Sequence, residues 1–114
     1  MKDGLTVSSD GTKEWRVNGE LHREDGPAIE LPNGTKYWFI NNKFHREDGP
    51  AIEQADGHKE WWVNGERHRE DGPAIELPND FNQYWLNGVE VVGSELRKIR
   101  AREEANIENT LAVL

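Results

Sequence analysis

The sequence predicts a mainly β protein: a single twisted antiparallel meander of stacked 23-residue hairpin repeats, followed by one C-terminal α-helix. Three observations lead to this prediction. The nonapeptide HREDGPAIE occurs three times without a change, and its copies begin at His22, His45 and His68, which sets a period of 23 residues. Short aromatic segments are followed by Asn-Gly or Asn-Asn pairs, which favour tight hairpins. Residues 94–114 contain neither glycine nor proline, which favours a helix.

Alignment on the nonapeptide divides the chain into a repeat sheet, residues 1–93, and a helical segment, residues 94–114. The sheet contains a half-repeat, three full repeats and a partial repeat, at 3–10, 11–33, 34–56, 57–79 and 80–92. The irregular units lie at the two ends. This is typical of repeat proteins, because a terminal unit needs an outer face that is compatible with solvent.

Each repeat opens with a short strand segment. KEWRV at 13–17 and its copies KYWFI, KEWWV and QYWL are aromatic and β-branched, as strands are. Asn-Gly or Asn-Asn follows each segment, and a type I′ turn needs positive φ at both of its central residues. An Asp-Gly-Pro break and the strand Ala-Ile-Glu come next, and a further turn joins one repeat to the next.

Alternation of side chains along these strands assigns their two faces. One face carries a regular series, interpreted as the core face: Trp15/Val17, Trp38/Ile40, Trp61/Val63 and Tyr84/Leu86. The opposite face begins charged and becomes aromatic, with Tyr37, Phe39, Trp62 and Trp85. Because a soluble protein seldom leaves a large apolar patch bare, we expect something to cover these four rings.

The C-terminal segment is the candidate cover. Gly93 breaks the chain and Ser94 is a suitable N-cap, which predicts a helix over about 94–112. Its apolar residues fall near one face at helical spacing: Leu96, Ile99, Ile107, Leu111 and Leu114. Two positions for the helix stay open, either folded back on the aromatic face of its own sheet or paired with its copy in a homodimer.

The chain is acidic, with 14 basic and 22 acidic residues and a net charge of −8. The segment from Ser94 holds four of each sign, so the whole excess lies in the repeats. This argues against nucleic-acid binding, which needs the opposite sign, and fits a basic protein partner. The absence of cysteine favours a cytoplasmic location. Since neither a secretory signal nor an apolar membrane span is visible, no membrane association is expected.

The HRED blocks contain residue types that catalyse reactions, but they recur in every full repeat, whereas an active site is usually unique. We interpret them as a structural ladder of polar pairs, which includes His22, Arg23, Asp25, His45, Arg46, Asp48, His68, Arg69 and Asp71. Equivalent histidines are separated by two strand spacings, roughly 9–10 Å, whereas zinc–nitrogen bonds are only about 2 Å long. No metal site and no cofactor are therefore predicted.

An enzyme is not predicted either, because no nucleophile–base arrangement is visible. The serines lie near the ends of the chain, at Ser8, Ser9 and Ser94, and there is no cysteine. The glycines follow the hairpin turns and do not form a phosphate-binding loop. His58 replaces a threonine in the third repeat and is interpreted as a surface variant.

The motif resembles a known repeat family. A Trp, an Asn-Gly pair, a His four residues after the Asn (Asn18 to His22, Asn64 to His68) and a closing Asn-Gly or Asp-Gly are similar to MORN repeats. The pattern W-x-x-N-G-x-x-H-R-E-D-G-P-A more closely resembles a MORN-like variant of small phage and bacterial proteins. Arg-Glu-Asp stands before the Gly where MORN repeats have His-Gly-x-Gly, so lipid association is not carried over. The resemblance covers about residues 3–92 and implies a stacked-hairpin sheet for protein–protein contact or dimerisation.

The leading functional prediction is a non-enzymatic protein–protein interaction module. Its candidate partner-binding residues are Tyr37, Phe39, Trp62 and Trp85, since aromatic residues ringed by polar groups form hot spots. The phage-like variant implies an inhibitor of a host defence protein, acting in the host cytoplasm. Two alternatives stay open. One is a small-ligand protein that holds a nucleotide with Arg and Trp side chains. The other is a structural subunit of a larger assembly such as a virion.

Overall fold

The computed structural model describes residues 3–112, and their side chains as far as Asn109. In this range the chain is mainly β with a single helix, α1 (Gly93–Ala112), which confirms the predicted fold class. The strands are β1 (Gly4–Val7), β2 (Lys13–Val17), β3 (Glu20–Leu21), β4 (Ile29–Glu30), β5 (Lys36–Tyr37), β6 (Phe39–Ile40), β7 (Lys43–Phe44), β8 (Ile52–Glu53), β9 (Lys59–Glu60), β10 (Trp62–Val63), β11 (Glu66–Arg67), β12 (Ile75–Glu76), β13 (Trp85–Leu86) and β14 (Val89–Glu90).

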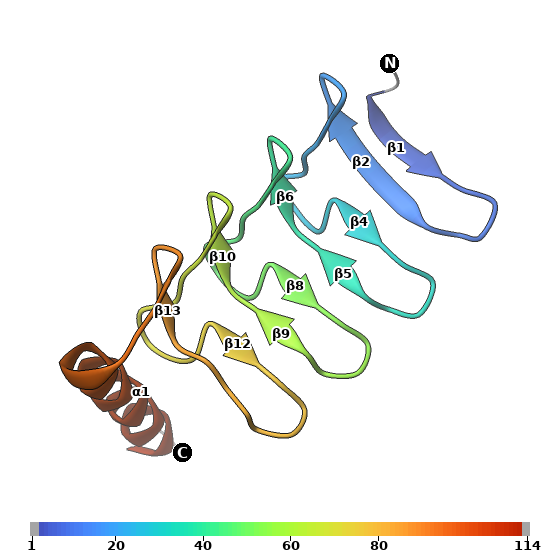
Figure 1. The fold of residues 1–114 in the computed structure, drawn as a ribbon. Helices are drawn as coiled ribbons and strands as arrows, with labels where there is room; N and C mark the ends of the chain where they lie inside the picture. The colour runs from blue at the N-terminus through green and yellow to red at the C-terminus, as the bar shows by residue number, and fades with distance from the viewer. Residues whose placement is uncertain (1–2, 113–114) are drawn as a thin grey trace.

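A long antiparallel meander runs the length of the molecule (Figure 1). Its strands follow the order of the chain, β1-β2-β4-β5-β8-β9-β12, and β3 adds to β2 at the side. Each repeat contributes its opening strand and its Ala-Ile-Glu strand, and the latter pairs with the opening strand of the next repeat. Tyr37, for example, is opposite Ile29 on one side and Ile52 on the other. The meander is therefore built from successive repeats, as the 23-residue period predicts.

The Asn-Gly turns form a second row beside the meander, made of the hairpins β6–β7, β10–β11 and β13–β14 (Figure 1). Asn41 and Asn42 have φ values of 48° and 63°, as a type I′ turn requires. The opening strand is interrupted at Trp38, Trp61 and Tyr84. At Trp38 the backbone N–H donates to Ala51 and the carbonyl accepts from His45, so this residue links the two rows.

The predicted core face is wrong. The fully buried repeat residues are the alanines of the nonapeptide, Ala28, Ala51 and Ala74, whereas Trp15 and Trp38 are only half-buried. The molecule measures 47 × 29 × 27 Å, and its radius of gyration of 16.1 Å exceeds the roughly 13 Å of a compact domain of this length. The described strands form one meander with a row of two-stranded hairpins beside it, and the tryptophans of the predicted core face stay partly exposed.

The helix forms where it was predicted, but it does not cover the aromatic face. Ile99 is 0% exposed against the last repeat, while Ile107, further along α1, is 55% exposed. Leu111 and Leu114 lie outside the described side chains. The hydrogen bonds of α1 to the sheet go to Tyr84, Glu70 and Asp71, on the face opposite Trp85. The array lacks a fourth HRED block to cover Tyr84, and the helix packs there instead.

Among the described residues, no helix is both long and apolar enough to span a membrane.

Candidate interaction surfaces

Each HRED block is a loop that holds its arginine between a tryptophan ring and a glycine. In the second repeat the Arg46 guanidinium carbon lies 3.9 Å from the centroid of the Trp38 ring. On its other side, a Cβ added to Gly49 would come within 2.9 Å of that carbon. Arg23 and Arg69 lie over Trp15 and Trp61 at the same distance of 3.9 Å. A side chain at the glycine of the motif would therefore force the guanidinium to shift.

Hydrogen bonds fix the same guanidinium groups. Arg46 Nε donates to Asp48 Oδ1 at 3.0 Å, and Nη1 donates to the Pro50 carbonyl at 3.1 Å. The first and third blocks repeat this pattern, and Arg69 also donates to Glu76 at 3.1 Å. Contacts to the ring, to a carboxylate and to a carbonyl therefore hold each of these guanidinium groups within its own loop.

The histidines connect one repeat to the next. Nδ1 of His22 accepts a hydrogen bond from the Asn41 backbone N–H at 3.1 Å, and His45 and His68 do the same for Asn64 and Asn87. A neutral histidine that accepts at Nδ1 carries its proton on Nε2, which lies 3.5 Å from a Glu24 carboxylate oxygen in the first block. Each histidine therefore holds the turn of the following hairpin.

The HRED residues thus have structural contacts in every block. Backbone bonds reinforce them, because the Arg23 N–H donates to the Phe39 carbonyl and the Asn42 N–H donates to the Leu21 carbonyl. Among the described side chains, no group of three His, Cys, Asp or Glu residues is placed to hold a metal ion. The geometry supports a ladder that fastens neighbouring repeats.

Two grooves lie between successive HRED loops, which we call loop 1 (22–26), loop 2 (45–49) and loop 3 (68–72). Groove 1, between loops 1 and 2, has Trp38 and Ile40 on its floor and a volume of about 750 Å³. Groove 2, between loops 2 and 3, has Trp61 and Val63 on its floor and a volume of about 860 Å³. The walls expose carboxylates, and the Glu47 side chain is 82% exposed. The walls of each groove carry the arginines of the loops beside these carboxylates, and Arg102 of α1 also lines groove 2.

A row of aromatic side chains lies on the opposite face. We define the aromatic row by six residues: Tyr37, Phe39, Phe44, Trp62, Arg67 and Trp85. The Phe44 ring centroid is 4.3 Å from that of Phe39 and 5.4 Å from that of Trp62. The Arg67 guanidinium carbon is 5.1 Å from the ring centroids of both Trp62 and Trp85.

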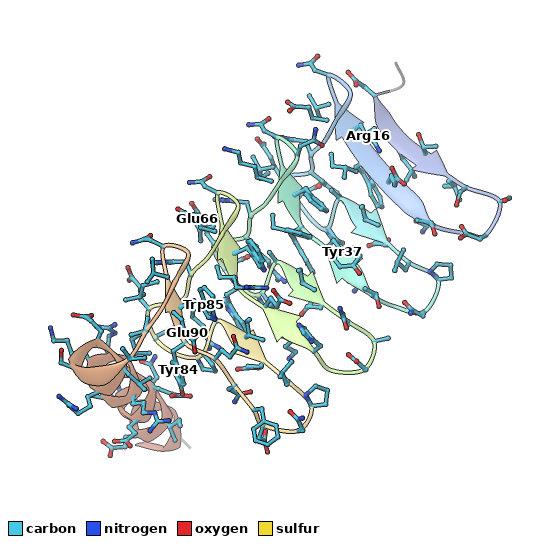
Figure 2. The ribbon with its side chains drawn as sticks, viewed as in Figure 1. Arg16, Tyr37, Glu66, Tyr84, Trp85 and Glu90 are labelled. Atoms are coloured by element: carbon cyan, nitrogen blue, oxygen red, sulfur yellow. The ribbon has the colours of Figure 1, made fainter. Side chains whose placement is uncertain are left out.

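The structure places all four predicted partner-binding residues in this row, and Figure 2 shows Tyr37 and Trp85 at separate points along the array. Sequence reasoning missed Phe44 and Arg67. The signal for both was the turn type, because a two-residue hairpin sets Phe44 opposite Phe39 and Arg67 opposite Trp62.

A buried carboxylate supports the row in the third repeat. Glu60 is 9% exposed and accepts hydrogen bonds from Trp62 Nε1 at 2.9 Å and from Arg67 Nε at 3.3 Å. His58 Nε2 lies 2.6 Å from its other oxygen, so the interpretation of His58 as a surface variant is wrong. Burial alone would raise the pKa of Glu60, but hydrogen bonds from His58, Trp62 and Arg67 together hold it below its usual value.

Comparison of the chain with protein-family models, with curated proteins and with solved structures found no match. The MORN-like resemblance therefore stays a prediction from the motif, and function is argued from the geometry of the two faces.

Proposed function

We propose that this protein is a non-enzymatic protein–protein interaction module that contacts its partner through the aromatic row. One observation carries the proposal. The rings of the row are only half-buried, although the one helix of the described chain has docked on the opposite face. A surface of aromatic rings with an arginine among them has the composition of an interface centre, where such residues supply most of the binding energy.

The dimensions and rigidity of the row support this proposal. A stable interface buries about 800 Å² on each partner, and an array of 47 × 29 Å has a face large enough for that. The ladder of His, Arg and Asp contacts fixes the hairpins that carry the rings. A rigid surface loses little conformational entropy on binding, so more of the contact energy appears as affinity.

The acidic repeats favour a basic partner, because opposite charges around an interface accelerate the encounter. A cytoplasmic location fits a chain without cysteine. The MORN-like resemblance extends the proposal further, to a phage-encoded inhibitor of a host defence protein. In that form the aromatic row would cover a functional surface of the host protein.

Affinity capture from bacterial lysate tests the proposal. The tagged chain is compared with Trp62→Ala/Trp85→Ala, which removes the two largest rings of the row. Phe81→Ala/Val92→Ala is the matched control, because Phe81 and Val92 are 72% and 75% exposed and lie outside the row. Circular dichroism checks that each variant keeps its sheet.

The expected result is a stoichiometric protein that the parent and the control both capture and the double tryptophan variant loses. Equal capture by all three chains would show that the row is not the contact surface. Capture by none of them would remove the support for a protein-binding function.

A further inference from the structure

The first strand of the meander has a partner on one side only. β1 pairs with β2, and no other described strand pairs with its outer side, which we call the free edge. Further along the array, Ile52 of β8 pairs with Tyr37 on one side and with Glu60 on the other, and it is only 7% exposed. Figure 1 shows β1 as the outermost strand, with α1 at the opposite end. The free edge is therefore a position where a further strand can pair.

The backbone groups on the free edge belong to Leu5 and Val7. Trp15 is opposite Leu5 in the register of β1 and β2. The Trp15 N–H donates to the Ala28 carbonyl and the Trp15 carbonyl accepts from the His22 N–H, so both groups point away from β1. Two opposed residues of an antiparallel pair either exchange both bonds or direct all of these groups outward. Leu5, and Val7 two residues further on, therefore direct their N–H and C=O groups to the free edge.

The side chains along this strand leave the free edge open to pairing. Leu5 and Val7 are 52% and 55% exposed, and both lie on the face that carries Trp15. The segment Gly4–Ser9 contains neither a charged residue nor a proline. Folded proteins commonly protect a sheet edge with lysine or proline, which oppose the addition of another strand. This edge has neither of these two protections.

We propose that two copies of this chain pair through the free edge of β1 and form a homodimer, with a two-fold axis at Thr6. In this register Leu5 of each copy is opposite Val7 of the other, and each of these pairs exchanges two N–H···O=C bonds. The Leu5 and Val7 side chains of both copies meet on one face, where their exposed apolar surface becomes buried. The edge fits an acidic copy of itself, because no like charges are brought opposite each other across the two strands.

One free edge in each chain makes the assembly closed. Pairing continues the meander across the axis, and each end of the dimer then carries a helix α1 (Figure 1). The axis is perpendicular to the sheet, so the aromatic rows of the two copies face the same side. This last consequence rests on the proposed function, since a partner could then be held by two rows at once. The pairing of the two chains itself is independent of any partner.

Sedimentation equilibrium of the full chain, from about 1 μM to about 1 mM, measures the dimer. Val7→Pro removes one N–H from the free edge and leaves the bonds to β2 in place. Leu5→Lys/Val7→Lys sets like charges opposite each other across the axis. Val89→Lys/Val92→Lys is the matched control, because these valines are 68% and 75% exposed and receive the same charge change elsewhere. Thermal melts followed by circular dichroism check the fold of each variant.

A single cysteine tests the register. Thr6 is opposite its own copy in a pair that is not hydrogen-bonded, where Cα atoms are about 4.5 Å apart, within the range of a disulfide. The chain has no cysteine, so Thr6→Cys adds the only thiol. Ser8→Cys is the control, because this residue lies two positions further along the same face and would be roughly 13 Å from its copy.

The parent chain is expected to dimerise, and salt should strengthen the dimer by screening the repulsion between two acidic copies. Val7→Pro and Leu5→Lys/Val7→Lys should each weaken it about tenfold or more, whereas the valine control should not. Under mild oxidation, Thr6→Cys should form a cross-linked dimer and Ser8→Cys should not. A parent chain that stays monomeric throughout, a dimer that survives both edge variants, or equal cross-linking of the two cysteine variants would overturn the proposal.

Discussion

At the scale of single residues, the same arrangement of tryptophan, arginine and glycine recurs in all three HRED blocks. The Arg46 guanidinium has a ring on one side and the Gly49 backbone on the other, and its donors are directed at Asp48 and Pro50. A side chain at Gly49 would have to push the guanidinium off the ring. The arginine and the glycine therefore act as one unit.

We expect Gly49→Ala to lower the free energy of unfolding by about 1–2 kcal/mol, because the guanidinium loses its ring contact and hydrogen bonds. In an Arg46→Ala background the same change should have almost no effect, since nothing then occupies the space beside the glycine. Urea denaturation of the two single variants and the double variant measures this coupling. Additive losses would contradict the arrangement described for the loop.

Glu60 gives a second prediction at this scale. Its pKa is lower in the folded chain than the usual 4.5, so its ionised form stabilises the fold. This contribution is complete above the usual pKa and is lost as pH falls through the lower folded value. We expect Glu60→Gln to reduce stability at neutral pH by roughly 1–3 kcal/mol and to make the decline in acid shallower.

Thermal melts between pH 3 and pH 7 measure both effects of the Glu60 substitution. The matched control is Glu14→Gln, at the equivalent position of the first repeat, where the carboxylate bonds to Arg16 and is 37% exposed. If the melting temperature of Glu60→Gln falls with pH as steeply as that of the parent chain, the buried carboxylate does not govern stability in acid.

At the scale of elements, α1 is attached by a short stretch of its length. Ile99 is fully buried, whereas Ile107 is 55% exposed, and Arg102 reaches loop 3 between them. We expect Ile99→Ala to destabilise the docked helix by about 2–4 kcal/mol and Ile107→Ala to change it little. Limited trypsin digestion measures this, because the exposed Lys98 and Arg100 flank Ile99 and are cleaved when the detached helix unfolds. If trypsin cleaved Ile99→Ala and Ile107→Ala at the same rate, the result would contradict the docking of α1 through Ile99.

The sequence was sufficient to predict the hairpins and the helix, since Asn-Gly turns, the nonapeptide period and a Gly-free segment each act locally. It was not sufficient to predict which face is buried. Alternation places Trp38 and Phe39 on opposite faces but does not show that the tryptophans stay partly exposed. The sequence was also not sufficient to predict where the helix docks. The helix packs on Tyr84 because no fourth HRED loop covers that residue, and this is a matter of packing between units. Phe44 and Arg67 could have been placed from the two-residue turns, because these set Phe44 opposite Phe39 and Arg67 opposite Trp62.

At the scale of the whole molecule, the repeats contact only their neighbours, so their number is expected to be adjustable. Deletion of residues 28–50 removes one period and joins Pro27 to Ala51, which restores an intact HREDGPAIE block. We expect a folded, less stable chain that is shorter by about 9–10 Å along its long axis. Small-angle X-ray scattering and circular dichroism measure the length and the fold.

The control for this deletion removes residues 28–49, one residue fewer, and leaves an additional proline before Ala51. The extra residue falls in the segment where the alanine is fully buried, so this chain should lose much more stability. Similar stability of the two deletions would show that the units are not in register with one another.

The crosswise strands of the array have a mechanical consequence. The first strand and the helix lie at opposite ends of the long axis, and the strands run across it (Figure 1). Tension between the termini therefore pulls along the inter-strand hydrogen bonds and loads them pair by pair, as in opening a zipper. Each released repeat of 23 residues would lengthen the chain by about 70 Å, the extended length less the spacing it already spans. Under tension the repeats would unfold one at a time in steps of equal length. A partner bound across several repeats would oppose their separation.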